Sequence, residues 1–204
     1  DTIMPTGTGG FVLDTAVLDI TAIQADGLTV TEIGASTMNI SALEGDLDAD
    51  LSGIVVTTLT AALDTSSSRA FTPNANLGTA VITTSGGTGP ITADSGATMP
   101  TGVGKFVLDT ATLTLTAEHA DGLTVTQIGT STVNVTELEG DLNAILTGIN
   151  VTNALGAFDS TGNAIIGDSA DYSDFDITIT GNGIVTSDSG ATLTTGEFTV
   201  TSPA

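Results

Sequence analysis

A tandem duplication is the feature that most limits what this chain can fold into. The segment that begins at Phe11 returns at Phe106, and positions 12–63 and 107–158 are identical at 32 of 52 sites. Self-similarity at a fixed period is typical of repeat architectures, in which neighbouring units bury a common core. The sequence therefore predicts a tandem array rather than one irregular globule.

A shorter match marks the start of a third copy. The DSGAT motif at Asp94 returns as DSGAT at Asp188. We predict a first module over residues 1–93 and a second over 94–187, with residues 188–204 as the opening strand of a third repeat. The phases of the two ends are complementary, which indicates either a longer array or subunits that join head to tail, the opening strand then lying between subunits.

Short alternating segments predict an all-β fold. Segments that begin at Leu113, Leu123 and Val133 place aliphatic residues on one face and Thr or Asn on the other, with starts 10 residues apart. Alternation with period two is the pattern of a half-buried strand. The even spacing favours a β-solenoid, in which aliphatic ladders stack inside. About seven strands in each module also fit an immunoglobulin-like β-sandwich, which is the alternative.

A short helix is expected to interrupt the strands in each module. Ser41 and Thr136 each precede a glutamate by three residues, which is the spacing of a capping box. Leucines then recur every fourth residue over 43–51 and 138–146, a spacing that favours a helix. The same segments also alternate in a way that strands do, and each contains a glycine.

Charge limits the partners and the location. The chain carries 2 basic and 24 acidic residues, a formal net charge of −22, and it has no cysteine. Such a chain has no electrostatic route to nucleic acid or to anionic membranes. No stretch reaches the ~18 apolar residues that a membrane helix needs, so membrane insertion is not expected. Salt or divalent cations would screen the self-repulsion, which favours a secreted protein at the cell surface.

Several motifs resemble a family of secreted proteins. The motifs ADGLTVT, TVNVTELEGDL, LSGI and DSGAT look like the Thr-rich β-strand repeats of large bacterial surface proteins, which include S-layer-like proteins and giant adhesins. The resemblance covers nearly the whole chain at the level of composition and repeat. It implies a structural or adhesive role at the cell surface, and it carries no catalytic residue.

No enzyme motif is present. His119 is the only histidine, and the first module has Gln24 in the same place. A serine hydrolase needs a histidine that an acid orients, whereas His119 is expected in a polar turn. Aromatic residues make up only 3% of the chain, so the usual platforms for sugar stacking are scarce. We therefore predict that the protein is not an enzyme.

Calcium is the one cofactor that the sequence favours. Calcium takes six to eight oxygen ligands, chiefly from aspartate and backbone carbonyls, and 18 of the 24 acidic residues are aspartate. One candidate site is the run Asp46, Asp48 and Asp50, although a solvated acidic face explains that run as well. The other candidate lies near the end of the second module and has four carboxylates within nine residues: Asp168, Asp171, Asp174 and Asp176.

Phenylalanines mark the repeat boundaries. Phe11, Phe106 and Phe198 each follow a Gly-rich segment, and each is expected to fill a core where modules meet. We expect the strand that contains Phe198 and Val200 to pair with another copy of the chain near Phe11, because an unpaired strand edge is a template for association.

These observations predict an extracellular structural protein whose modules assemble head to tail into a filament or a surface layer. A spacer segment of a long adhesin is the first alternative. The second is a β-helix module that binds or degrades glycans, in which case a surface glycan would be the partner. A cleft with two carboxylates less than about 10 Å apart would favour that second alternative.

Overall fold

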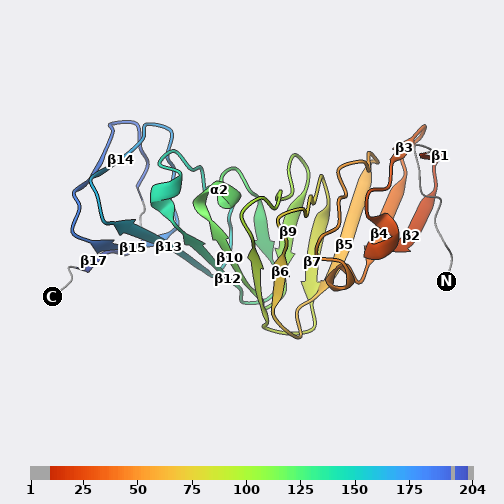
Figure 1. The fold of residues 1–204 in the computed structure, drawn as a ribbon, viewed down its shortest axis with the longest axis horizontal. Helices are drawn as coiled ribbons and strands as arrows, with labels where there is room; N and C mark the ends of the chain where they lie inside the picture. Colours follow the sequence, from red (N-terminus) through yellow and green to blue (C-terminus); the bar gives the residue numbers. More distant parts are fainter. Residues whose placement is uncertain (1–9, 194–195, 202–204) are drawn as a thin grey trace.

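The computed structural model describes residues 10–193 and 196–201, including the backbone of Phe198 and Thr201 but not their side chains. The chain forms a β-solenoid of about nine turns, whose strands stack along the long axis of the molecule from β1 near one end to β17 at the other (Figure 1). Every strand pair in the described residues is parallel. This result confirms the predicted solenoid and excludes the sandwich, since immunoglobulin-like sheets are antiparallel.

Two long sheets form most of the solenoid. The six-stranded sheet contains β2 (Val17–Thr21), β4 (Thr37–Ser41), β5 (Thr58–Asp64), β7 (Val81–Ser85), β9 (Lys105–Leu108) and β11 (Val125–Gln127). The seven-stranded sheet contains β6 (Arg69–Phe71), β8 (Pro90–Ala93), β10 (Thr112–Thr116), β12 (Thr132–Thr136), β13 (Asn153–Ser160), β15 (Asp176–Gly181) and β17 (Phe198–Thr201). Two short sheets complete the coil: β1 (Phe11–Leu13) with β3 (Val30–Glu32), and β14 (Ala164–Ile166) with β16 (Val185–Ser187).

The length of one coil explains the predicted spacing of strands. Stacked strands lie between 19 residues apart, as in Phe106 with Val125, and 24 apart, as in Val81 with Lys105. One coil therefore holds about two of the 10-residue intervals seen in the sequence. As a result, β10 stacks on β12, while the segment between them lies on a different side of the coil.

Alternating side chains build the core. In β12, Val133 and Val135 are fully buried, whereas Thr132, Asn134 and Thr136 on the other face are partly exposed. Burial of one such aliphatic side chain stabilises a fold by roughly 1.5–3 kcal/mol. Ladders of polar groups run outside: the Asn39 amide donates to Asp19 Oδ1 at 2.7 Å, and Thr60 Oγ1 donates to Asn39 Oδ1 at 2.8 Å.

The predicted helices are much shorter than the leucine spacing indicates. Only single turns of 3-10 helix form there, η1 (Leu43–Gly45) and η2 (Leu138–Gly140). Leu43 and Leu51 are both fully buried, while Asp50 between them forms an isolated bridge to Asn76 in the next coil. The leucines therefore serve successive sides of one coil: the short helix expected in each module is present as a single turn, and the rest of the leucine run is not helical.

Two other short helices were not predicted. These are α1 (Ala22–Ala25) and α2 (Ala117–Ala120), which occupy equivalent places in the two modules. The backbone N–H of Thr21 donates to Gln24 Oε1 at 3.0 Å, and His119 N donates to Thr116 Oγ1 at 3.4 Å. Contacts of this kind satisfy free N–H groups where a helix begins. His119 thus lies in a helix and is partly buried, which corrects the expected polar turn.

Equivalent strands of the two modules lie in different sheets. The first module places β2, β4, β5 and β7 in the six-stranded sheet, whereas their equivalents β10, β12, β13 and β15 lie in the seven-stranded sheet. Similarly, β1 and β3 form a short sheet, but their equivalents β9 and β11 extend the six-stranded one. β6 and β8 belong to the seven-stranded sheet, and their equivalents β14 and β16 form the other short sheet. Each repeat therefore advances around the coil by one side.

Candidate assembly interface

The joint between the two modules is a continuous stack. Strand β9 of the second module pairs with β7 of the first, with Phe106 beside Ile82. Strand β10 pairs with β8, with Leu113 beside Ile91. The predicted boundary between residues 93 and 94 directly follows β8, and both long sheets cross it without a break.

Large apolar side chains fill this joint. Phe106 is fully buried, and its ring lies 6.3 Å from that of Phe71 at an interplanar angle of 57°. Ile91, Leu108 and Leu113 have no exposed surface. The prediction that Phe106 fills a core where modules meet is therefore confirmed.

The same positions are less covered in the first coil. Phe11, Leu13 and Leu18 are equivalent to Phe106, Leu108 and Leu113, but each is only partly buried. On the outer face of β1 and β2, Val12 is 61% exposed and Val17 is 67% exposed. The first coil therefore resembles a module joint of which one half is missing among the described residues.

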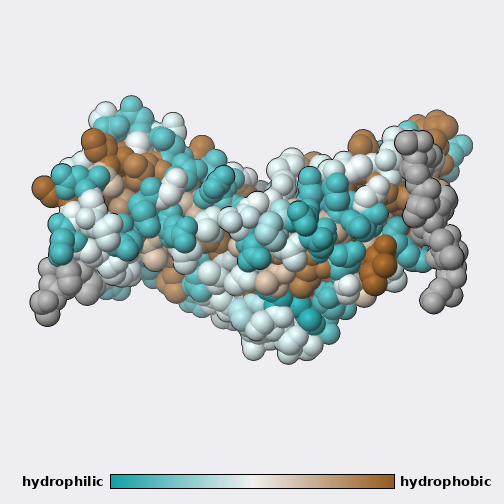
Figure 2. All heavy atoms as spheres, viewed as in Figure 1, coloured by the Kyte–Doolittle hydropathy of each residue, from teal (hydrophilic) through white to brown (hydrophobic). Residues whose placement is uncertain are grey.

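The last coil presents the complementary half. Strand β17 pairs with β15 so that Phe198 lies beside Ile177, the register that Phe106 has beside Ile82. Val200 is 69% exposed, whereas the side chain of Phe198 lies outside the described residues. In the adjacent short sheet Ile184 precedes β16 and is 65% exposed. Apolar atoms lie near both ends of the molecule on the face that Figure 2 shows.

The sequence predicts Phe11 and Val200 as assembly residues, which stays a prediction, and it does not single out β2 and β16, which lie at the same two ends of the stack. Leu18 in β2 is the equivalent of Leu113, which pairs with Ile91 of β8 in the joint. Val185 in β16 is the equivalent of Ile91 and is partly buried. The signal was available in the alignment of the copies, but it needed the parallel stacking order to become visible.

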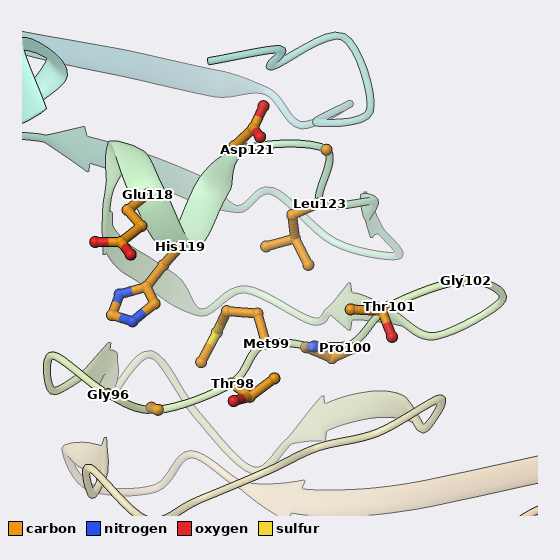
Figure 3. Close-up of a pocket in the computed structure, with 12 residues that line it drawn as sticks. Gly96, Thr98, Met99, Pro100, Thr101, Gly102, Glu118, His119, Asp121 and Leu123 are labelled. Atoms are coloured by element: carbon orange, nitrogen blue, oxygen red, sulfur yellow. The ribbon is translucent and has the colours of Figure 1, made fainter. Parts of the chain in front are cut away.

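A surface pocket of about 420 Å³ lies within the second module, close to its boundary with the first. Glu118 and His119 project from α2 on one side, and Met99 and Pro100 lie on the other (Figure 3). His119 Nδ1 lies 3.1 Å from Thr116 Oγ1. Glu118 and Asp121 are the two carboxylates of the lining.

The first aspartate run forms hydrogen bonds with the chain. Asp48 accepts a hydrogen bond from the hydroxyl of Thr72 in the next coil. Asp50 Oδ1 accepts from Ser52 N at 3.0 Å, and Asp46 Oδ1 accepts from Asp48 N at 3.3 Å. These carboxylates therefore cap turns and link coils.

The aspartates of the second candidate site also accept hydrogen bonds from the backbone. Asp168 Oδ1 accepts from Gly190 N at 3.1 Å, Asp171 Oδ1 from Ser173 N at 3.1 Å, and Asp176 Oδ1 from Glu197 N at 2.8 Å. Asp174 adopts a left-handed backbone with φ of 71°. Within residues 10–193 and 196–201, no three acidic or histidine side chains lie close enough together to hold a metal ion. Calcium binding stays a prediction.

The described residues establish the fold, and the comparisons with known proteins add no protein family to it. No helix in the described part of the chain is long and apolar enough to cross a membrane. No protein family, curated protein or solved structure matches the chain.

Proposed function

We propose that this chain is an extracellular structural protein whose tandem β modules stack head to tail into a filament or a surface layer. The internal joint carries this proposal, because the contacts that bury Phe106 and Leu113 there are incomplete around Phe11 and Leu18 in the first coil. A second copy placed at that end would supply the missing half.

The physical driving force is burial of apolar surface and of unpaired strand edges. A contact between two different ends is heterologous, so it propagates as a filament unless its rotation closes a ring. Parallel pairing also satisfies the N–H and C=O groups of an edge strand. Each added copy would be stabilised both by the burial of apolar surface and by the pairing of its edge strands.

Charge sets the conditions for assembly. A net charge of −22 opposes the approach of two copies, and this repulsion weakens as salt screens it. The internal joint contains Lys105, but the last coil has Glu197 at that place beside Asp176. Assembly should therefore increase with ionic strength, and a divalent cation should promote it more strongly than a monovalent one. These conditions are those of an extracellular setting.

The alternative function is that of a spacer in a long adhesin. The two unbroken sheets make the module joint a rigid connection, which is what a spacer requires. A spacer would extend a binding tip without self-association, so its mass would not depend on concentration.

A glycan-binding or glycan-degrading module is a further candidate. The pocket with Glu118 and Asp121 favours it. However, Phe and Tyr are absent from the lining of that pocket. Binding or turnover of surface polysaccharides that is lost in E118Q and D121N would support this candidate.

Light scattering over a range of protein concentration tests the leading proposal. The mass is measured with calcium, with chelator and at two ionic strengths, and large species are viewed by electron microscopy. Growth into filaments or sheets is expected, and its loss in chelator would place calcium in the joint. A constant mass of one chain in every condition would overturn self-assembly and leave the spacer.

A further inference from the structure

We propose that copies of this chain join by strand exchange: β17 of one copy takes the place of β1 on β3 of the next copy. This inference rests on the proposed self-assembly, and it specifies which strands form the contact between two copies. The partner is a second copy of this chain, and its contact surface is the outer edge of β3 together with that of β2.

Strands β1, β9 and β17 occupy the same position in successive copies of the repeat. Strand β9 pairs with β7 on one edge and with β11 on the other, so it lies at the centre of the internal joint. Among residues 10–193 and 196–201, strand β1 has only the second of these contacts, because it pairs with β3, the equivalent of β11. Within the same residues strand β17 has only the first, because it pairs with β15, the equivalent of β7. One strand between β15 and β3 would complete the joint, and β1 and β17 compete for that place.

The register of the exchanged joint follows from the internal one. Phe106 pairs with Val125, so Phe198 is expected beside Val30 of the next copy. The following pairs are then Thr199 with Thr31 and Val200 with Glu32. In the single chain, Phe11, Val12 and Leu13 occupy those same positions beside β3.

A second ladder closes at the same time. In the internal joint Leu113 of β10 pairs with Ile91 of β8. The equivalents are Leu18 of β2 in the next copy and Val185 of β16, both of which are only partly buried. Exchange brings these two edges together, whereas β1 bound to β3 contributes nothing to β2. The exchanged joint therefore buries more apolar surface than the local pairing that it replaces.

Simple addition is the competing geometry, in which β1 stays in place and β17 pairs with the edge of β1 that faces away from β3. The two geometries differ at Thr31. In exchange, Thr199 lies directly beside Thr31, while in simple addition it lies beside Val12 and one strand further from Thr31. Adjacent strands are about 4.8 Å apart, so the extra strand places Thr31 and Thr199 beyond the reach of a disulfide.

The absence of cysteine from the chain makes disulfide trapping a clean test. A mixture of the single variants T31C and T199C is oxidised under conditions in which the protein assembles. Strand exchange predicts a disulfide-linked dimer from this mixture. A mixture of V12C and T199C is the control, and it is expected to give little dimer. A dimer from the control mixture and none from the first would overturn exchange in favour of simple addition.

A locked variant gives the second measurement. Val12 and Thr31 are paired in β1 and β3, so the double variant V12C/T31C can close a disulfide within one chain. The oxidised form is expected to remain at the mass of one chain, and reduction is expected to restore assembly. Circular dichroism of the oxidised form shows whether it is folded. If the oxidised, folded form assembles like the reduced form, strand exchange is wrong although self-assembly stands. If neither form nor the unmodified chain assembles, the proposed function fails and the joint with it.

Discussion

Phe11 and Phe106 occupy the same position in the two modules, yet only Phe106 is fully buried. Both follow a glycine-rich segment, and both begin an FVL segment that lies in a short strand. The difference lies in what stacks on the other edge: β9 has β7 there, and β1 has no described strand. The comparison shows that the local sequence sets which side chain points inward, while the neighbouring coil decides how deeply it is buried.

The largest expected difference between the two modules is between the variants F106A and F11A. Replacement of a fully buried Phe by Ala is expected to lower the unfolding free energy by about 3–5 kcal/mol. The protein loses the free energy of burying the ring, and the cavity that remains has a further cost. F11A should cost less than half of that amount, since its ring already meets solvent. Denaturant unfolding of both variants at equal protein concentration measures the difference. Equal losses would mean that the first coil is packed as tightly as the internal joint.

A second test compares β5 with β13. Ala61 and Leu63 in β5 correspond to Gly156 and Phe158 in β13, so the second module has the larger side chain at the second position and the smaller residue at the first. A Cβ at Gly156 would lie 2.5 Å from Ile177 Cδ1, and G156A is expected to destabilise the protein by about 1–3 kcal/mol through overpacking.

The double variant G156A/F158L restores the residue pair of the first module. It should be more stable than the sum of its two single variants predicts, and thermal unfolding of the four proteins gives the coupling energy. Simple additivity would show that the two positions do not share space.

A third and smaller effect concerns the link between coils at Thr72. Its hydroxyl donates to Asp48, but the second module has Gly167 and Asn143 at these positions. T72A is expected to cost about 0.5–1.5 kcal/mol, the usual net contribution of one hydrogen bond. A double-mutant cycle with D48A isolates this coupling. N143A serves as the matched control, with an expected change within about 0.5 kcal/mol; a larger loss there would break the comparison.

The smallest expected effect is a pH dependence at Glu32. Thr57 Oγ1 donates to Glu32 Oε1 at 2.6 Å, and Ser36 N donates to Oε2 at 2.7 Å. These hydrogen bonds, the first above all, hold the pKa of Glu32 below its usual 4.5. A lowered folded-state pKa means that the contribution is present above pH 4.5 and is lost as pH falls through the folded pKa.

The second module has the neutral equivalent. Gln127 accepts from Ser131 N at 3.0 Å and donates to Thr152 Oγ1 at 2.8 Å. E32Q should therefore lose less stability than the unmodified chain on acidification from neutral pH, and Q127E should lose more. Unfolding free energies of the three proteins across that range measure this. Parallel curves would show that the pKa of Glu32 is the same in the folded and unfolded states.

The strand pattern was predictable because it is local. Val133 and Val135 alternate with polar residues, and period two alone assigns them to one face of a strand. The choice of a solenoid depended on the 10-residue spacing, which measures half of a coil. Phe106 was predicted in a core because it recurs at a module boundary.

Other features depend on contacts far apart in the sequence. The leucines from Leu43 to Leu51 match a helix in spacing, but their burial is shared between two sides of one coil. The short helix α1 has a local signal, Thr21 followed by Gln24, that is too brief to stand out. Leu18 and Val185 of the proposed joint are apolar residues like many others in the chain, and only the stacking order shows that their equivalents in the internal joint have partners that they lack among the described residues.

The advance of each repeat by one side of the coil has a consequence for how such genes can change. Loss or gain of one module by recombination would keep every ladder intact, because β9 and β17 begin successive copies on adjacent sides. It would, however, turn everything beyond the crossover by one side of the coil. A feature displayed at one module position would therefore point in a new direction after each such event. The number of modules in such an array would therefore set the orientation of its far end as well as its length.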